Sequence, residues 1–129
     1  MSDHVALITG ASGGLGRAVA ARLAEAGWRL ALVGRSAARL KSVAPAEALQ
    51  IEADVSTHEG ARAAFAQCAE RFGTPVALVN CAGGTLIAPL QRTSESAYRA
   101  CLSANLDTAF FSLAAFVEGL RAAQQPGAA

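Results

Sequence analysis

Short apolar runs alternate with amphipathic stretches along the chain. The runs are uninterrupted by polar residues, which is the pattern of strands buried on both faces of a parallel sheet. Between them, apolar residues recur at helical spacing, as expected for helices that each turn one side toward that sheet. The pattern predicts strands over residues 5–9, 30–33, 49–53 and 76–79.

Capping and breaking residues delimit the predicted helices. Ser36 and Thr57 precede two of them, and their hydroxyl oxygens are suited to accept hydrogen bonds from first-turn N–H groups. Gly27 is placed to end the first helix, and residues 73–75 break the third. The predicted helices cover residues 17–26, a short segment up to 43, and residues 58–72, 94–102 and 105–122.

Alternating strands and helices predict an α/β fold, a Rossmann-like doubly wound parallel sheet with the strand order 3-2-1-4, truncated after about four strands. Ligands of such sheets bind beyond the carboxyl ends of the strands, at the switch point between strands 1 and 4. Thr9, Arg35, Asp54 and Asn80 stand at those strand ends. We therefore expect these separated positions to converge on one crevice.

Composition limits the class of protein. With 129 residues, 53% hydrophobic and 16% charged, the chain has the size of one domain. Its formal charge of +1 and its lack of a basic cluster argue against nucleic-acid and anionic-membrane partners. No uninterrupted apolar run reaches the roughly 18 residues of a membrane span, and the N-terminus does not resemble a signal peptide. These features predict a soluble cytoplasmic protein.

The cysteines and histidines show no metal or triad pattern. Cys68, Cys81 and Cys101 are odd in number and lack C-x-x-C spacing, so we expect reduced thiols and no metal site. Neither His4 nor His58 stands in a motif with a nucleophile. His58 is expected on the exposed first turn of a helix.

The segment Thr9-Gly10-Ala11-Ser12-Gly13-Gly14-Leu15-Gly16-Arg17 joins the first strand to the first helix. Glycines there permit a tight turn and a close approach to phosphate, and the helix directs free N–H groups and the positive end of its dipole toward it. Ser12 can donate a further hydrogen bond. A glycine-rich turn without a ligand is the alternative. No Lys-Ser/Thr pair follows the glycines, which argues against a P-loop.

The spacing T-G-x-x-x-G-x-G resembles the glycine motif of the short-chain dehydrogenases/reductases. Asp54-Val55, Asn80-Cys81-Ala82-Gly83 and Asn105 recur in that family's order, with Cys81 where a second Asn is usual. The resemblance runs from about Val5 to the C-terminus, yet it covers only about half of a family member. It implies a cofactor site made by Gly10, Ser12, Gly14, Leu15, Gly16, Arg35, Asp54, Val55, Asn80, Ala82 and Gly83.

Residues after the second strand favour NADP(H) over NAD(H). An NAD-binding unit normally has a carboxylate at that strand end to bind the adenosine ribose, but Gly34 stands there. Arg35 follows, and its planar guanidinium suits a 2′-phosphate. A solvated surface arginine is the alternative. The resemblance gives Asp54 a contact with the adenine amino group, although an Asp at a strand end can equally be a turn or capping residue.

The family transfers hydride between nicotinamide and a carbonyl or alcohol, using an Asn, a Ser and a Tyr-x-x-x-Lys pair. Only Asn105 matches; a helix-kink or capping residue is the alternative. Tyr98 and Lys41 are the only tyrosine and lysine, and neither fits the pair. Residues 1–129 are therefore interpreted as the NADP(H)-binding part of such an oxidoreductase, cut or naturally truncated and inactive alone. A non-catalytic NADP(H)-binding or interaction module is the alternative function.

Truncation would leave apolar surface uncovered. The fourth strand becomes a sheet edge, and the last helix carries apolar residues on more than one side. We expect a homo-oligomer or a missing C-terminal segment, and a small carbonyl or alcohol substrate once the chain is complete. The loop 84–92 is expected either to line an apolar pocket or to pack. The apolar residues concerned are Phe110, Phe111, Leu113, Phe116, Val117 and Leu120 in the helix, and Leu86, Ile87 and Leu90 in the loop.

Overall fold

The structure, a computed structural model, describes residues 3–124. A parallel sheet of four strands lies at its centre in the order β3-β2-β1-β4, which confirms the predicted topology. Ile8 lies opposite Leu32 on one side and Val79 on the other. The strands are β1 (Val5–Thr9), β2 (Arg29–Gly34), β3 (Leu49–Glu52) and β4 (Ala77–Asn80).

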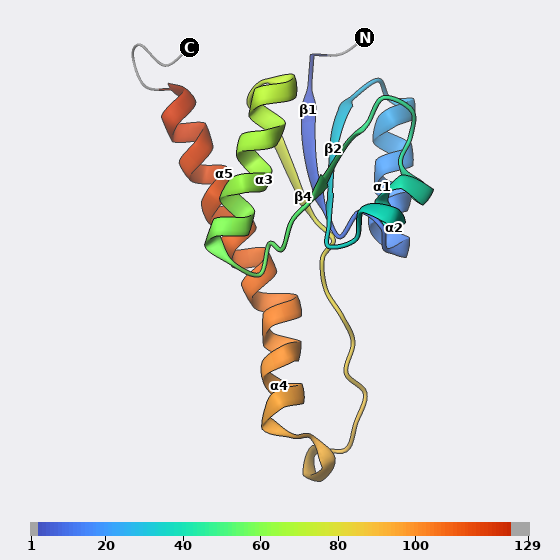
Figure 1. Cartoon of the computed structure of the whole chain (residues 1–129), viewed down its shortest axis with the longest axis vertical. Coiled ribbons are helices and arrows are strands. Elements are labelled where there is room, and N and C mark those ends of the chain that lie inside the picture. The colour runs from blue at the N-terminus through green and yellow to red at the C-terminus, as the bar shows by residue number, and fades with distance from the viewer. Residues whose placement is uncertain (1–2, 125–129) are drawn as a thin grey trace.

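Helices cover both faces of the sheet (Figure 1). Ile8 and Leu32 belong to the core beneath α1 (Gly14–Glu25) and α2 (Ala37–Val43). Leu7 and Val33 belong to the opposite core, beneath α3 (His58–Phe72) and α5 (Thr108–Gln124). Successive residues of a strand point to opposite faces, so two covered faces account for the uninterrupted apolar runs.

Most predicted element bounds agree with the structure, and the caps are confirmed. The hydroxyl oxygen of Ser36 accepts from the Arg39 amide at 3.3 Å, and that of Thr57 accepts from the Gly60 amide at 3.0 Å. The predicted start of the first helix at residue 17 is wrong, because α1 begins at Gly14. Glycines have low helix propensity, so the local sequence conceals a helical turn that the fold imposes.

The two helices predicted over 94–102 and 105–122 are one continuous helix. It comprises α4 (Glu95–Leu102), the π-helical turn η2 (Ser103–Asp107) and α5, and a 3₁₀ turn, η1 (Leu90–Arg92), precedes it. The prediction of two separate helices is wrong, because the π-turn joins them without interrupting the helix. In Figure 1, α4 and the loop before it extend beyond the carboxyl ends of the strands.

This continuous helix bears on the expected absence of a membrane segment. The helix over Glu95–Gln124 has 30 residues and contains an 18-residue stretch with a mean hydropathy of 1.5, enough by length and composition to cross a bilayer. Its most apolar 18-residue stretch is 17% buried. A single such helix is weak evidence for a membrane protein, because a helix that packs against another protein surface has the same composition.

Apolar side chains of the last helix are uncovered on the side away from the sheet, as the sequence predicted. Phe110 is 63% exposed and Leu113 53% exposed. In the loop before α4, Ile87 and Leu90 are almost fully exposed, so of the two alternatives for this loop, ordinary packing is wrong. Among residues 3–124, apolar exposure is thus concentrated in the last third of the sequence.

Candidate functional site

The carboxyl ends of β1 and β4 are joined by side-chain hydrogen bonds. Thr9 and Asn80 are partners in the sheet register, and the Thr9 hydroxyl donates to Oδ1 of Asn80 at 3.3 Å. The same hydroxyl accepts from the Ala82 amide at 3.4 Å. Thr9 is fully buried. These contacts hold the segment after β4 against β1, at the switch point where the crevice was expected.

Two of the three motif glycines are required by the packing of this chain. Gly10 has a φ of 61°, and a Cβ there would overlap the backbone of Cys81 and Ala82. A Cβ on Gly16 would overlap the carbonyl oxygen of Gly10. A Cβ on Gly14 would meet no atom within 4 Å outside its own helical turn. The packing of this chain therefore explains Gly10 and Gly16 but leaves open space beside Gly14.

The N-terminus of α1, which follows the carboxyl end of β1, has no side-chain cap. Its N-cap residue, Gly13, has an extended backbone and no side chain, whereas α2, α3 and α4 each have a Ser or Thr that caps the first turn. Ser12 is partly buried next to it, and Leu15 on the first turn is 69% exposed. First-turn N–H groups are consequently available to an acceptor outside the helix.

Arg35 and Asp54 follow the carboxyl ends of β2 and β3. Oδ1 of Asp54 accepts from the Ser56 hydroxyl at 2.6 Å and from the Ser56 amide at 3.0 Å. These bonds lower the pKa of Asp54, and the charge of Arg35 lowers it further. Through its Oδ1, Asp54 therefore acts as a turn residue, which was the alternative interpretation of this position. Val55 beside it is 7% exposed.

Asn105 anchors the loop that follows β4. Its side-chain amide donates to the carbonyl oxygens of Gly84 and Cys101, both at 2.9 Å, and its Oδ1 accepts from the Gly84 amide at 3.2 Å. A Cβ on Gly83 would come within 2.8 Å of that Oδ1. Asn105 lies in the π-turn, so the alternative interpretation as a helix-distorting residue is consistent with the structure. The same residue connects the helix to the Gly83-Gly84 backbone.

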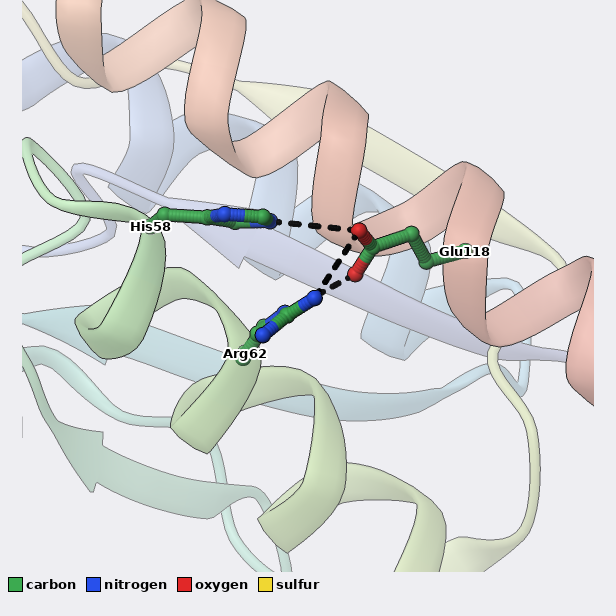
Figure 2. Close-up of polar contacts among 3 residues, drawn as sticks. All are labelled: His58, Arg62 and Glu118. Atoms are coloured by element: carbon green, nitrogen blue, oxygen red, sulfur yellow. Dashed lines mark hydrogen bonds and ion pairs between the residues drawn. The ribbon is translucent and has the colours of Figure 1, made fainter.

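His58 begins α3, as expected, but its side chain is only 38% exposed and belongs to a cluster that the sequence analysis missed. His58 stacks on Phe111 and lies 3.4 Å from the carboxylate of Glu118, to which Arg62 also pairs (Figure 2). The spacing of His58 and Arg62 places them on one side of α3, which was a usable signal. Their partner lies in a different helix, so local pattern did not reveal it.

The cysteines are free thiols. Burial raises the pKa of Cys68 to about 11, and burial also raises the pKa of Cys81. Within residues 3–124, no three His, Cys, Asp or Glu side chains are grouped as a metal site would require. Of the positions assigned to the cofactor, the structure brings Gly10, Asn80, Ala82 and Gly83 together with Asn105, while Arg35, Asp54 and Val55 lie at the neighbouring strand ends.

Comparison with known proteins identifies the family. The sequence model of the family described as short chain dehydrogenase matches residues 4–128. This match covers nearly the whole chain and agrees with the sheet order and the glycine turn described above. The chain belongs to the short-chain dehydrogenase family, a family of oxidoreductases.

Individual relatives are similar over most of this chain. A 2,3-dihydroxy-2,3-dihydro-p-cumate dehydrogenase of Pseudomonas putida is 30% identical, with 96% of this chain and 51% of that protein covered. An NADP-dependent (R)-specific alcohol dehydrogenase of Lentilactobacillus kefiri is 30% identical, with 86% and 46% covered. The crystal structure of a short-chain dehydrogenase/reductase of Brucella melitensis, described as a glucose/ribitol dehydrogenase, has a TM-score of 0.86 at 28% identity, with 92% and 52% covered. The chain spans about half the length of these relatives.

Proposed function

We propose that residues 1–129 form the NADP(H)-binding part of a short-chain dehydrogenase/reductase that acts on a carbonyl or alcohol. The observation that carries this proposal is the N-terminus of α1, which has no side-chain cap and has open space beside Gly14. A pyrophosphate would accept hydrogen bonds from the free N–H groups, with the Ser12 hydroxyl as a further donor. Leu15 on the same exposed turn would contact the cofactor from outside the sheet.

The adenosine end of the cofactor would lie across β2 and β3. Arg35 would pair with a 2′-phosphate, and Gly34 presents no carboxylate to repel it. Asp54 would accept from the adenine amino group through Oδ2, because its Oδ1 is used by Ser56. Val55 would supply an apolar contact. The name of the alcohol dehydrogenase relative includes NADP, which supports the same preference in this chain.

The nicotinamide end would lie along the segment that Asn80 and Thr9 hold against β1. Nicotinamide supplies or accepts the hydride when it is bound. The backbone of Ala82 and Gly83 would approach its ribose closely, since neither residue has a large side chain. Asn105 fixes this backbone through Gly84 and would act there as the family's catalytic Asn.

The rest of the reaction needs groups outside this sequence. A carbonyl reduction requires a proton donor and a polarising group at the substrate oxygen. Tyr98 is the only tyrosine, and it lies half exposed on α4, while Lys41 is on α2. We therefore infer that the isolated chain binds cofactor without turning over substrate.

The uncovered helix side would be covered by a second copy of the chain or by the remaining part of the enzyme. Phe110 and Leu113 lie on this side, and β4 is an edge strand. Small-molecule substrates are the expected partners, with neither nucleic acid nor membrane involved. Three free thiols fit a reducing compartment such as the cytoplasm.

A second candidate is an NADP(H)-binding or interaction module without catalysis. It is favoured by the absence of a Tyr-x-x-x-Lys pair from all 129 residues. Supplying the C-terminal half of a relative as a separate chain distinguishes the two. Carbonyl reduction that appears upon complementation supports the enzyme, and cofactor binding without any reduction supports the module.

Calorimetric titration of NADPH and NADH into the chain tests cofactor binding. Arg35→Ala is expected to weaken NADPH binding about 10- to 100-fold, the effect of losing a charge-assisted pair, and to change NADH binding little. Arg71→Ala is the matched control, because Arg71 is an exposed arginine near the C-terminus of α3, away from the crevice. Equal loss for both nucleotides, or no binding by the unmodified chain, would contradict the proposal.

A further inference from the structure

α3 and α5 are connected by the charged cluster of His58, Arg62 and Glu118. Nε of Arg62 donates to Oε2 of Glu118 at 2.9 Å, and the terminal NH2 group of Arg62 donates to Oε1 at 3.1 Å. Nε2 of His58 lies 3.4 Å from Oε1 (Figure 2). Hydrogen bonding lowers the pKa of Glu118 and raises that of Arg62. Two bonds in a planar, bidentate arrangement restrict geometry more than a single contact does.

Further contacts determine how α5 lies on α3. The ring of Phe111, two helical turns before Glu118, stacks on His58 with 5.8 Å between centroids. On the other side of Glu118, a Cβ at Gly119 would overlap the ring of Phe65. α5 therefore has little freedom to rotate or slide on α3.

The orientation of α5 is transmitted to Asn105 because the helix is continuous. The π-turn follows α4 and leads directly into α5, and the Thr108 hydroxyl at their junction donates to the Ala104 carbonyl oxygen at 2.8 Å. A shift of one residue rotates a helix by about 100°. Such a rotation would turn the Asn105 side chain away from Gly84 and break both of its hydrogen bonds to that residue.

We propose that Glu118 is a positioning residue for the loop after β4. By binding Arg62 and His58, it sets the orientation of α5 on α3, and thereby the hydrogen bonds between Asn105 and the Gly84 backbone. Glu118 itself touches neither the loop nor the crevice. The consequence for cofactor binding rests on the proposed function, whereas the consequence for the loop does not.

Hydrogen exchange of the Gly84 amide, resolved by NMR at pH 8, tests the proposal without cofactor. Glu118→Gln keeps the shape of the side chain and removes its charge. Gly84 exchange is expected to become about two- to fivefold faster, while the β1 amides keep their rates. Glu25→Gln is the matched control, because Glu25 pairs with Arg22 within α1 and not between helices.

A charge swap tests whether electrostatic attraction between α3 and α5 is the cause of slow Gly84 exchange. Arg62→Glu combined with Glu118→Arg is expected to restore slow Gly84 exchange in the same measurement, because the double variant again pairs opposite charges. Unchanged Gly84 exchange in Glu118→Gln would overturn the proposal. Equal acceleration of all amides would also overturn it, because Glu118 would then only stabilise the fold.

NADPH titration of the same variants separates this inference from the proposed function. Glu118→Gln is expected to weaken NADPH binding by the same two- to fivefold as the loop loosens. If the unmodified chain bound no NADPH, the proposed function would fail, and the exchange rates would still decide the role of Glu118. If NADPH bound equally well to both despite faster Gly84 exchange, the part of the proposal that concerns the cofactor would be overturned.

Discussion

β1 and α5 are both rich in apolar residues, yet only β1 is buried throughout. β1 has hydrogen-bonded neighbours on both edges and helices over both faces. α5 packs against α3 and β4 with one side and exposes Phe110, Leu113 and Val117 on another. The difference shows that apolar content makes a segment suitable for burial, whereas its actual burial depends on which partners are present.

β4 and the long helix belong to the same uncovered region. Within residues 3–124, β4 pairs only with β1, and none of the β4 residues is fully buried. The chain covers about half of the length of the relatives that it matches. This uncovered region is therefore the surface on which we expect the rest of an enzyme, or a second copy, to pack.

The largest expected effect is the difference in free energy of unfolding between removing a buried side chain of the sheet and removing an exposed one of α5. Leu32→Ala in β2 removes a fully buried side chain and should lower the free energy of unfolding by about 2–5 kcal/mol. Phe110→Ala removes a larger but exposed ring and should cost less than about 0.5 kcal/mol. Urea unfolding of both variants measures the difference. Similar costs would mean that the outer side of α5 is covered in solution.

Substitutions of Gly10 and Gly14 compare a glycine that is tightly packed with one that has open space beside it. Gly10→Ala should lower the free energy of unfolding by at least about 1–3 kcal/mol, because of its positive φ and the overlap with Cys81 and Ala82. Gly14→Ala should leave that free energy unchanged or raise it by up to about 1 kcal/mol, since alanine favours a helix. It should nevertheless weaken NADPH binding about tenfold or more by filling the open space. Thermal unfolding and calorimetry report the two effects. Unimpaired NADPH binding by Gly14→Ala would contradict the proposed phosphate position.

Self-association tests whether the uncovered helix side attracts a second copy. Phe110→Glu should raise the dissociation constant of any oligomer about tenfold, as expected for an aromatic residue at the centre of an interface. Ala38→Glu adds the same charge to an exposed position on α2 and should have no effect. Sedimentation velocity over a range of concentrations measures both. Equal behaviour of the two variants would place the contact elsewhere.

The smallest expected effect is the pH dependence of the stability that the contact between α3 and α5 contributes. The pKa of Glu118 is below its ordinary 4.5 because Arg62 donates to the carboxylate, so the unfolded chain binds this proton more readily than the folded one. The contribution to stability is complete above about pH 4.5 and is lost as pH falls through the lowered value. Glu118→Gln should remove this part of the pH dependence. Unfolding measured between pH 6 and pH 3 compares the two, and parallel curves would contradict the expectation.

Local pattern was sufficient for much of the fold. Uninterrupted apolar runs located the strands, and Ser36 and Thr57 located two helix starts, because capping depends on neighbouring residues alone. The crevice was predictable because parallel strands place their carboxyl ends at one edge. The start of α1 was not, since Gly14 and Gly16 are poor helix formers. Gly16 packs closely on the Gly10-Ala11 backbone, a contact that the local helical pattern does not show.

The sequence by itself determined the strand order, the glycine turn, the family, and which residues stand at the strand ends. Each of these follows from residues close together in the chain or from a rule for joining consecutive elements. Only the tertiary structure decided that α4 and α5 are continuous, that Asn105 holds Gly84, and that Glu118 pairs with Arg62 and His58. The Asn105 and Glu118 contacts join residues far apart in sequence, whose proximity depends on how the helices pack on the sheet. The continuity of α4 and α5 depends on a π-turn, whose spacing differs from the regular helical pattern.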